Sequence, residues 1–203
     1  MASLLELLKS ELGASVLETH AQYGDETAVI APEAWLAAAR LLRDSPKASM
    51  EMLVDLTCVD YPDRNPRFEV VVHLLSLSKG HRLRIKCRVG DEDGDDAKID
   101  SLTELWGSAN WSEREAFDMF GVQFVGHPDL RRILMYPEFV GHPLRKDYPA
   151  NKIQPLVPYR EEPGLEKLPP FRADEGMPFG RQSFDRVGED EQPLVATDQE
   201  RMR

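Results

Sequence analysis

The stretch WSEREAFDMFGVQFVGHPDLRRILMYPEFVGHPLRKDYP, residues 111–149, says most about this chain, because it joins a short helix to two Gly-His-Pro turns. Ser112 and Glu115 stand three positions apart, which is the spacing of a capping box at a helix start. The helix is therefore predicted to begin at Glu113. Gly121 is suited to the left-handed conformation that ends helices, so the predicted helix stops just before it.

The spacing of side chains within this predicted helix assigns its faces. Phe117 and Phe120 are three apart and are predicted to share the face that packs on the core. Arg114 and Asp118 are four apart and are predicted to form an ion pair on another face. Trp111 precedes the predicted cap and would pack back onto the first turn as a hydrophobic staple.

This stretch resembles the signature of the 30 kDa subunit of respiratory complex I, known in bacteria as the C subunit. The resemblance also reaches upstream, to Asp55-Leu56-Thr57, to Val59-Asp60-Tyr61-Pro62 and to the run His73–Leu77, and covers roughly residues 50–150. The signature positions, which the resemblance makes candidates for a subunit interface, are Glu113, Arg114, Glu115, Phe117, Asp118, Phe120, Gly121, His127, Pro128, Asp129, Arg131, Arg132, His142, Pro143, Arg145, Lys146 and Asp147.

The resemblance implies a subunit of proton-translocating NADH:quinone oxidoreductase, which passes electrons from NADH through FMN and iron–sulfur centres to quinone. It implies that this chain holds no cofactor, that FMN and the Fe-S clusters lie in partner subunits, and that the chain packs against the 49 kDa quinone-site subunit, called D, near other Fe-S subunits. The alternative is the equivalent subunit of a membrane-bound hydrogenase, a formate hydrogenlyase or an F420- or ferredoxin-linked dehydrogenase.

Composition limits the other functions that the chain can have. Its 203 residues are 41% hydrophobic, enough for one substantial core plus an extension. The net charge of −11 disfavours nucleic acid as a partner. No run approaches the ~18 apolar residues of a membrane span, and the N-terminus lacks a basic start. We expect a peripheral protein on the cytoplasmic side of the bacterial inner membrane, in contact with the membrane only through partners.

Only two cysteines occur, Cys58 and Cys87, and they form no Cys-x-x-Cys motif. An iron–sulfur cluster usually needs four thiolates and structural zinc needs four clustered ligands, so the chain by itself is expected to build neither. Each cysteine lies in a strand-like run, which predicts a buried, reduced thiol.

The rest of the first 150 residues predicts an α+β domain, with a mixed or antiparallel sheet covered by helices. A short helix from Ser101 to about Trp106 is predicted from a further capping-box spacing. The acidic loop from Asp91 lacks the residues of a calcium site. Phe68–Leu77 is nearly all apolar and is expected to be the central strand. The predicted helices are 3–12 and 32–43, and the predicted strands are 16–22, 27–31, 51–59, 68–77 and 81–89.

The last predicted strand alternates strictly between apolar and basic residues, with Arg82, Arg84, Lys86 and Arg88 on one face. A solvated or salt-bridged sheet face is the expected role of these cations. A docking role would favour an acidic protein, and a remote alternative is a stand-alone RNA-binding module.

Two chemical interpretations of the signature stretch compete with structural ones. His127, Asp129, His142 and Asp147 are competent metal ligands, but each histidine precedes a proline in a turn, which favours structural hydrogen bonds. Catalysis by the helix carboxylates is disfavoured because such groups usually cap helices. The basic residues after each turn are expected to hold acidic groups. No catalytic, cofactor-binding or metal-binding residue is therefore predicted.

From residue 151 onward the composition changes to isolated apolar side chains between prolines and charges. Such a segment cannot build a core of its own. Residues 151–203 are predicted to be an extended C-terminal arm that orders on partner subunits, with the last dozen residues loose.

Overall fold

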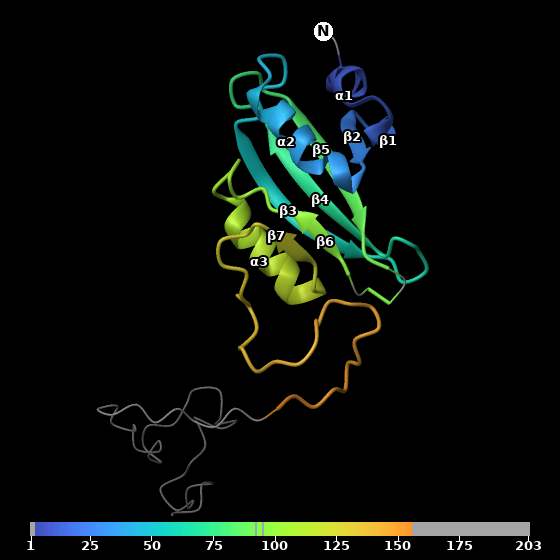
Figure 1. The fold of residues 1–203 in the computed structure, drawn as a ribbon, viewed down its shortest axis with the longest axis vertical. Coiled ribbons are helices and arrows are strands. Elements are labelled where there is room, and N and C mark those ends of the chain that lie inside the picture. The colour runs from blue at the N-terminus through green and yellow to red at the C-terminus, as the bar shows by residue number, and fades with distance from the viewer. Residues whose placement is uncertain (1–2, 92, 95, 156–203) are drawn as a thin grey trace, which may run out of the picture. The chain divides into compact units, whose positions relative to one another are not determined.

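The computed structural model describes residues 3–91, 93–94 and 96–155, and its elements follow each other in the order shown in Figure 1. The helices are α1 (Leu4–Leu12), η1 (Gly13–Ser15), η2 (Pro32–Ala34), α2 (Trp35–Asp44) and α3 (Ala109–Phe120). The strands are β1 (Val16–Gln22), β2 (Asp25–Ile30), β3 (Met52–Asp60), β4 (Phe68–Leu75), β5 (Arg82–Val89), β6 (Lys98–Asp100) and β7 (Gln123–Val125).

Five strands form one mixed sheet in the order β1-β2-β5-β4-β3. All neighbours are antiparallel except β2 and β5, which run parallel. The predicted α+β class is confirmed. The expectation that residues 68–77 form the central strand is wrong, because β2 pairs with β5 and extends the sheet on that side. The middle strand is therefore β5, and β4 lies between β5 and β3.

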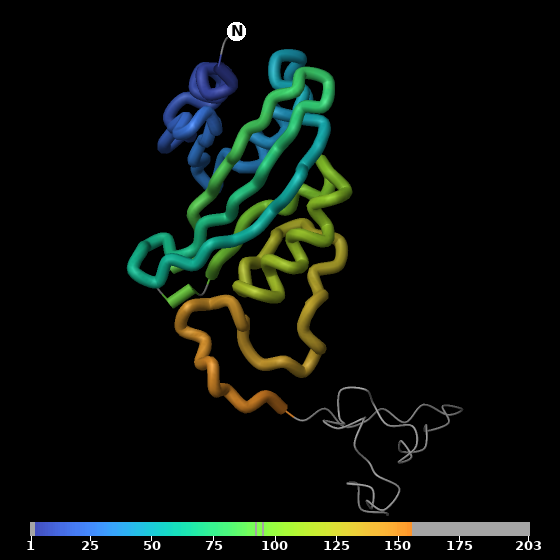
Figure 2. Tube along the Cα trace, turned by 180° about the vertical axis from the view of Figure 1, so that it is seen from behind, coloured from blue at the N-terminus to red at the C-terminus, as the bar shows by residue number. Residues whose placement is uncertain are grey.

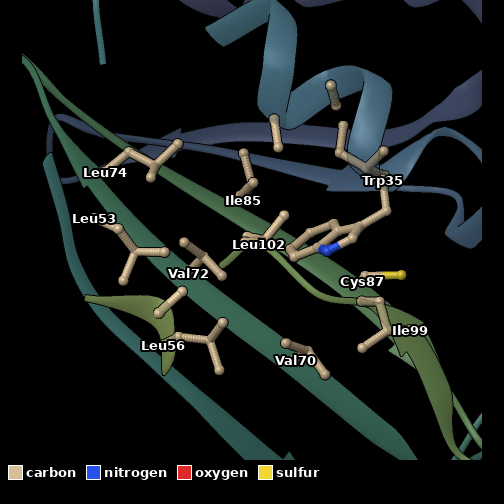
Figure 3. Close-up of a cluster of buried hydrophobic side chains, with 14 of the residues drawn as sticks. Trp35, Leu53, Leu56, Val70, Val72, Leu74, Ile85, Cys87, Ile99 and Leu102 are labelled. Carbon is tan, nitrogen blue, oxygen red and sulfur yellow. The ribbon is translucent and has the colours of Figure 1, made fainter. Parts of the chain in front are cut away.

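The helices cover one face of this sheet and leave the other open, as Figures 1 and 2 show from opposite sides. The covered face is a single apolar core. In Figure 3, Trp35 from α2 lies among side chains of β3, β4 and β5, together with Ile99 of β6 and Leu102. The indole and Leu102 are fully buried. The short parallel pair β6 and β7 brings the chain around α3 against this core.

The open face carries the basic side chains of β5, and most of them are paired. Lys86 Nζ lies 2.7 Å from a carboxylate oxygen of Glu69, and Arg88 pairs with Glu18 at 2.8 Å. Arg84 lies 3.6 Å from Asp25. The expected salt-bridged sheet face is confirmed, because β1, β2 and β4 supply the acidic partners.

Both cysteines are buried and free. Val70 of β4 pairs with Cys58 on one side and Cys87 on the other, so one strand separates the two thiols. Two strand spacings amount to about 10 Å, too far for a disulfide. Burial raises the pKa of each thiol to about 12. These observations match the prediction of buried, reduced thiols.

The start of α3 corrects the sequence prediction. The helix begins at Ala109, so Ser112 lies within it and forms no capping box. Ala109, Glu113, Ala116 and Phe120 recur at helical spacing and are all buried. Because this periodicity continues one turn upstream of Ser112, packing determines the start and overrides the local capping pattern. Trp111 is consequently a helix surface residue, 64% exposed, instead of a staple.

The helix predicted over residues 101–106 is a hydrogen-bonded turn instead. Both Leu105 and Trp106 donate their N–H groups to the Leu102 carbonyl, and the chain then turns directly into α3. The Ser101 hydroxyl accepts from the N–H of Thr103 and not from that of Glu104. The other predicted helices and strands are present to within a few residues.

The predicted boundary at residue 150 stays a prediction. Residues 151–155 continue from the domain, and the Gln154 side chain bonds both backbone groups of Val140. The remainder of the predicted arm, residues 156–203, lies outside the described residues.

Candidate functional site

The signature residues surround α3 and the irregular segment that follows β7, residues 126–149, which we call the signature loop. It is the yellow and orange trace beside α3 in Figure 1. No helix or strand occurs in it. Its backbone N–H and C=O groups therefore need hydrogen-bond partners other than those of a helix or a sheet, and side chains can supply them.

Asp118 is the anchor for the first part of the signature loop. Its buried Oδ2 accepts hydrogen bonds from the N–H groups of Ile133, Leu134 and Met135 at 3.1, 2.8 and 2.8 Å. Its Oδ1 lies 2.6 Å from Arg132 Nη1. Burial opposes ionisation, but the N–H of Met135, the Arg132 guanidinium and the other two N–H groups together lower the pKa of Asp118. The carboxylate is thus a fixed charge that shapes three consecutive residues.

The predicted ion pair between Arg114 and Asp118 does not form. Arg114 instead donates from Nε and Nη2 to the carbonyl oxygens of Arg131 and Arg132, at 3.0 and 3.1 Å. Asp118 takes Arg132 as its partner. Helical spacing makes the Arg114–Asp118 pair possible. The signature loop instead gives each side chain several hydrogen-bond partners, where an ion pair would give each only one.

The second Gly-His-Pro turn caps the C-terminal end of α3. The three carbonyl groups of residues 118–120 accept hydrogen bonds from His142 Nδ1, the N–H of Leu144 and Arg145 Nε, at 3.0, 3.1 and 2.6 Å. A helix leaves such carbonyls without partners inside the helix. The turn therefore supplies hydrogen-bond donors to the last carbonyl groups of α3, and these bonds fix the position of the turn.

Gly121 makes this close approach possible. It has φ +83°, and its N–H donates to the Phe117 carbonyl, so the predicted helix stop is confirmed. A Cβ at this position would lie 2.6 Å from Arg145 Nη2 and 2.7 Å from two atoms of the His142 ring. Glycine is required here for both conformation and space.

The histidines have structural hydrogen bonds, as the sequence predicts. His142 donates from Nδ1 to a carbonyl, and burial together with the nearby Arg145 and Arg132 lowers its pKa despite that bond. His127 donates from Nε2 to the Asn110 carbonyl at 3.1 Å, and its Nδ1 accepts from the N–H of Asp129. Within residues 3–91, 93–94 and 96–155, no three His, Cys, Asp or Glu side chains cluster closely enough to hold a metal ion.

The end of the signature loop is tied to the sheet by an ion cluster that sequence reasoning missed, in which Arg67 and Asp60 are buried and Asp147 is exposed. Arg67 bonds both carboxylate oxygens of Asp60, at 2.7 and 2.9 Å, and both of Asp147, at 2.9 and 3.2 Å. Asp60 also accepts from the N–H of Lys146 at 2.7 Å. Both aspartates lie in motifs that the sequence singled out, but nothing in the sequence pointed to Arg67 as the residue that joins them.

The remaining signature residues have lesser or local roles. Asp129 and Arg131 form an exposed pair at 2.9 Å, and Glu115 is exposed on α3. Phe117 contacts the His142 ring edge-on at 6.2 Å between centroids. Pro128 and Pro143 follow the two histidines in their turns. Glu113 does not take part in this network. It is buried and bonds Ser101 and Leu102 in the turn before α3.

The anchored signature loop presents large apolar side chains to its surroundings. Leu134, Val140 and Leu144 are 56%, 50% and 51% exposed. Their backbones are held by the contacts described above, to Asp118, Gln154 and Met119. A rigid surface with exposed apolar side chains is typical of a protein interface.

No helix in the described part of the chain is both long and apolar enough to cross a membrane.

Comparison with known proteins places this geometry in a family. The family described as "Respiratory-chain NADH dehydrogenase, 30 Kd subunit" matches residues 28–154. The C subunit of the NADH-quinone oxidoreductase of Thiobacillus denitrificans is 45% identical over 157 residues, covering 74% of this chain and 78% of the relative. That of Burkholderia multivorans is 46% identical over 161 residues, covering 74% and 80%.

Two solved structures share the fold. The trypsin-resistant fragment of Nqo5 is 30% identical, with a TM-score of 0.52 over 63% of this chain and 98% of the fragment. A chain of the archaeal membrane-bound sulfane sulfur reductase has a TM-score of 0.60 over 78% of this chain and 94% of its own, at 23% identity, and shows the fold alone. The family match and the 45–46% identical relatives establish that the chain belongs to the family of the respiratory-chain NADH dehydrogenase 30 kDa subunit, which includes the C subunits of bacterial NADH-quinone oxidoreductases.

Proposed function

We propose that this chain is a non-catalytic structural subunit of a proton-translocating NADH:quinone oxidoreductase. The observation that carries the proposal is the signature loop, which buried charges hold rigid while its apolar side chains point outward. A surface built in this way suits permanent docking, because little conformational entropy remains to be lost on binding.

The chemistry of the polar residues supports a role without an active site. Asp118, Arg132, His142 and Arg145 use their polar atoms to hold backbone groups or each other. The two thiols are buried and separated by a strand. In this proposal FMN and the iron–sulfur clusters reside in partner subunits, and this chain shapes and supports their assembly.

The partner that we propose for the signature loop is the 49 kDa quinone-site subunit, D, with Fe-S subunits nearby. Exposed apolar side chains on an anchored backbone, with an exposed cation such as Arg131 in the same loop, are residue types that stable interfaces use. Residues beyond 155 would extend this contact as an arm over neighbouring subunits. The complex would place the chain on the cytoplasmic side of the inner membrane, held there by partners.

The test is an assembly experiment with a matched control. The double variant Leu134→Ser/Leu144→Ser removes two exposed apolar side chains whose loss leaves the core intact. The control is Leu77→Ser, because Leu77 is 66% exposed beyond the end of β4, away from the signature loop. Each tagged chain is purified from native membranes in mild detergent, and NADH oxidation by a quinone analogue is measured in the eluate.

We expect the control to copurify with the 49 kDa-type subunit and NADH:quinone activity, and the double variant to be folded but unassembled. Full assembly of the double variant would refute the proposed docking surface. Copurification of the wild type with hydrogenase-type subunits and no NADH activity would instead assign the chain to one of the related complexes named above as the alternative.

The arm is tested separately by truncation. The structure recommends a cut after Pro155, because Gln154 still bonds Val140 of the domain. We expect the truncated chain to keep its thermal transition and to lose assembly. A truncated chain that assembles fully would show that residues 156–203 are not needed for docking.

A further inference from the structure

Glu113 is a fully buried carboxyl group whose role in the fold is not explained by the signature loop. Its Oε2 accepts from the Ser101 hydroxyl at 2.6 Å, and its Oε1 accepts from the N–H of Leu102 at 2.6 Å. Among the residues that the structure describes, Glu113 forms no ion pair. A buried carboxylate without a cation is costly, so its partners must make either charge state tolerable.

The Ser101 hydroxyl continues into a second hydroxyl. Ser101 Oγ and Thr103 Oγ1 are 2.8 Å apart, and either atom can be the donor. The N–H of Thr103 also donates to Ser101 Oγ at 3.2 Å. Ser101 is buried and Thr103 is half-exposed, so the chain of groups leads from the interior to solvent.

This arrangement can satisfy both protonation states of Glu113. With the carboxyl ionised, Thr103 donates its hydroxyl to Ser101, and Ser101 donates to Oε2. With the carboxyl protonated, the O–H of Glu113 donates to Ser101, Ser101 donates to Thr103, and the Thr103 hydroxyl turns to solvent. The N–H of Leu102 bonds Oε1 in both states, and no buried donor loses its partner.

We propose that Glu113, Ser101 and Thr103 form a proton-binding site, in which the carboxyl takes up or releases one proton while the two hydroxyls reverse the direction of donation. The proton is exchanged with solvent water at Thr103. Uptake removes one negative charge from between α3 and the turn that precedes it.

The charged groups on the elements around the site are either paired elsewhere or exposed to solvent. On α3, Arg114 and Asp118 are engaged with the signature loop. On β3, Asp60 pairs with Arg67 and the Cys58 thiol is neutral. The side chains of β7 do not titrate. The exposed charges on β6 and the turn are Lys98, Asp100 and Glu104, of which Glu104 lies 3.7 Å from Arg40.

The burial of Glu113 supports the proposed proton-binding site. It raises the pKa of Glu113 to about 7, against the hydrogen bonds of Ser101 and Leu102, which lower it. A proton is therefore exchanged within the neutral range of pH.

The test follows the side-chain carboxyl carbons of ¹³C-labelled glutamate by NMR in the full chain, from about pH 5 to about pH 9. We expect one glutamate to titrate with a midpoint near 7 and to be missing in Glu113→Gln. Glu115→Gln is the matched control, because it removes the same charge from an exposed site two residues away. A Glu113 signal that does not titrate in this range would overturn the proposal.

Two further variants keep the carboxyl and test the hydroxyl chain. Thr103→Val leaves Ser101 without an acceptor only when Glu113 is protonated, so the midpoint should fall by about half a pH unit to one unit. Ser101→Ala removes a donor to the carboxylate, and bonds to charged groups contribute more, so the midpoint should rise by about one unit. Shifts in the same direction would exclude the reversible chain, whether or not Glu113→Gln folds.

Discussion

The sheet and the signature loop are ordered by different forces. Strands β2 to β5 pair along their length and bury apolar side chains such as Phe68, Val72 and Ile85. The signature loop pairs with no strand, and charged side chains bond its backbone directly, as Asp118 does with three N–H groups. Order without regular structure here depends on side chains that bond the backbone directly, and the carboxylate of Asp118 makes the largest number of such bonds.

This difference predicts different responses to mutation. Loss of an apolar side chain from the sheet removes part of a large, redundant contact area, so the cost is graded. Loss of one charge that anchors the signature loop leaves several buried polar groups without partners, so the cost is concentrated in that residue.

The largest effect is expected for Asp118→Ala, at about 3 to 5 kcal/mol, because Arg132 and three N–H groups lose their partner together. Hydrogen exchange should show that residues 126–149 lose protection while β4 and β5 keep theirs. Leu83→Ala in β5 is the comparison, with a cost of about 2 to 5 kcal/mol. It should lower protection throughout the sheet. If both variants lost protection uniformly, the signature loop and the sheet would not be ordered by different forces.

A pH-dependent effect is expected from Glu113. Its folded-state pKa of about 7 lies above the ordinary value of 4.5, so the folded state binds the proton more tightly than the unfolded state. Stability should therefore fall as pH rises between these two values, by about 3 kcal/mol in total, and level off above them. Urea unfolding of the wild type and Glu113→Gln isolates this term, because His142 and the other titrating groups are common to both. Parallel stability curves for the two proteins would contradict the raised pKa.

Gly121→Ala should destabilise by about 1 to 3 kcal/mol, through its positive φ and the displacement of His142 and Arg145. Gly126→Ala is the matched control, since Gly126 has φ +84° but a Cβ added there would have nothing within 4 Å. The difference between their thermal unfolding free energies measures the close approach alone. Equal destabilisation by the two substitutions would mean that His142 and Arg145 move away from the added Cβ at no cost in stability.

The smallest effect is expected for Arg131→Ala, within about 0.5 kcal/mol, because its pair with Asp129 is exposed and screened by salt. Denaturant unfolding checks it. A cost comparable to that of Asp118→Ala would show that exposed charges also order the signature loop.

Much of the sheet could be predicted from the sequence, and so could the structural hydrogen bonds of the two turn histidines. Alternation of apolar and basic residues in 82–89 identified β5 and its two faces, because period-two burial is a local property. The order of the strands could not be predicted in the same way. Whether β4 or β5 lies in the middle depends on where β2 pairs, which is a contact between distant segments.

The start of α3 and the partners of its charges show why local patterns failed at the site. Ser112 and Glu115 satisfy the spacing of a capping box, yet the buried stripe through Ala109 and Glu113 extends the helix past them. Arg114 and Asp118 stand at ion-pairing distance along the helix, yet backbone groups of residues 131–135 compete successfully for both. In each case a longer-range contact contributes more than the local one.

The sequence by itself determined the α+β class, the strand faces, the buried thiols, the helix stop at Gly121 and the family resemblance, because each depends on residue type and short spacing. Only the tertiary structure decided that Arg67 joins Asp60 to Asp147, that the second Gly-His-Pro turn caps α3, and that Glu113 is buried beside Ser101. Those contacts join residues up to 87 positions apart, as between Asp60 and Asp147, and the energy of a buried charge depends on which partners the fold brings to it.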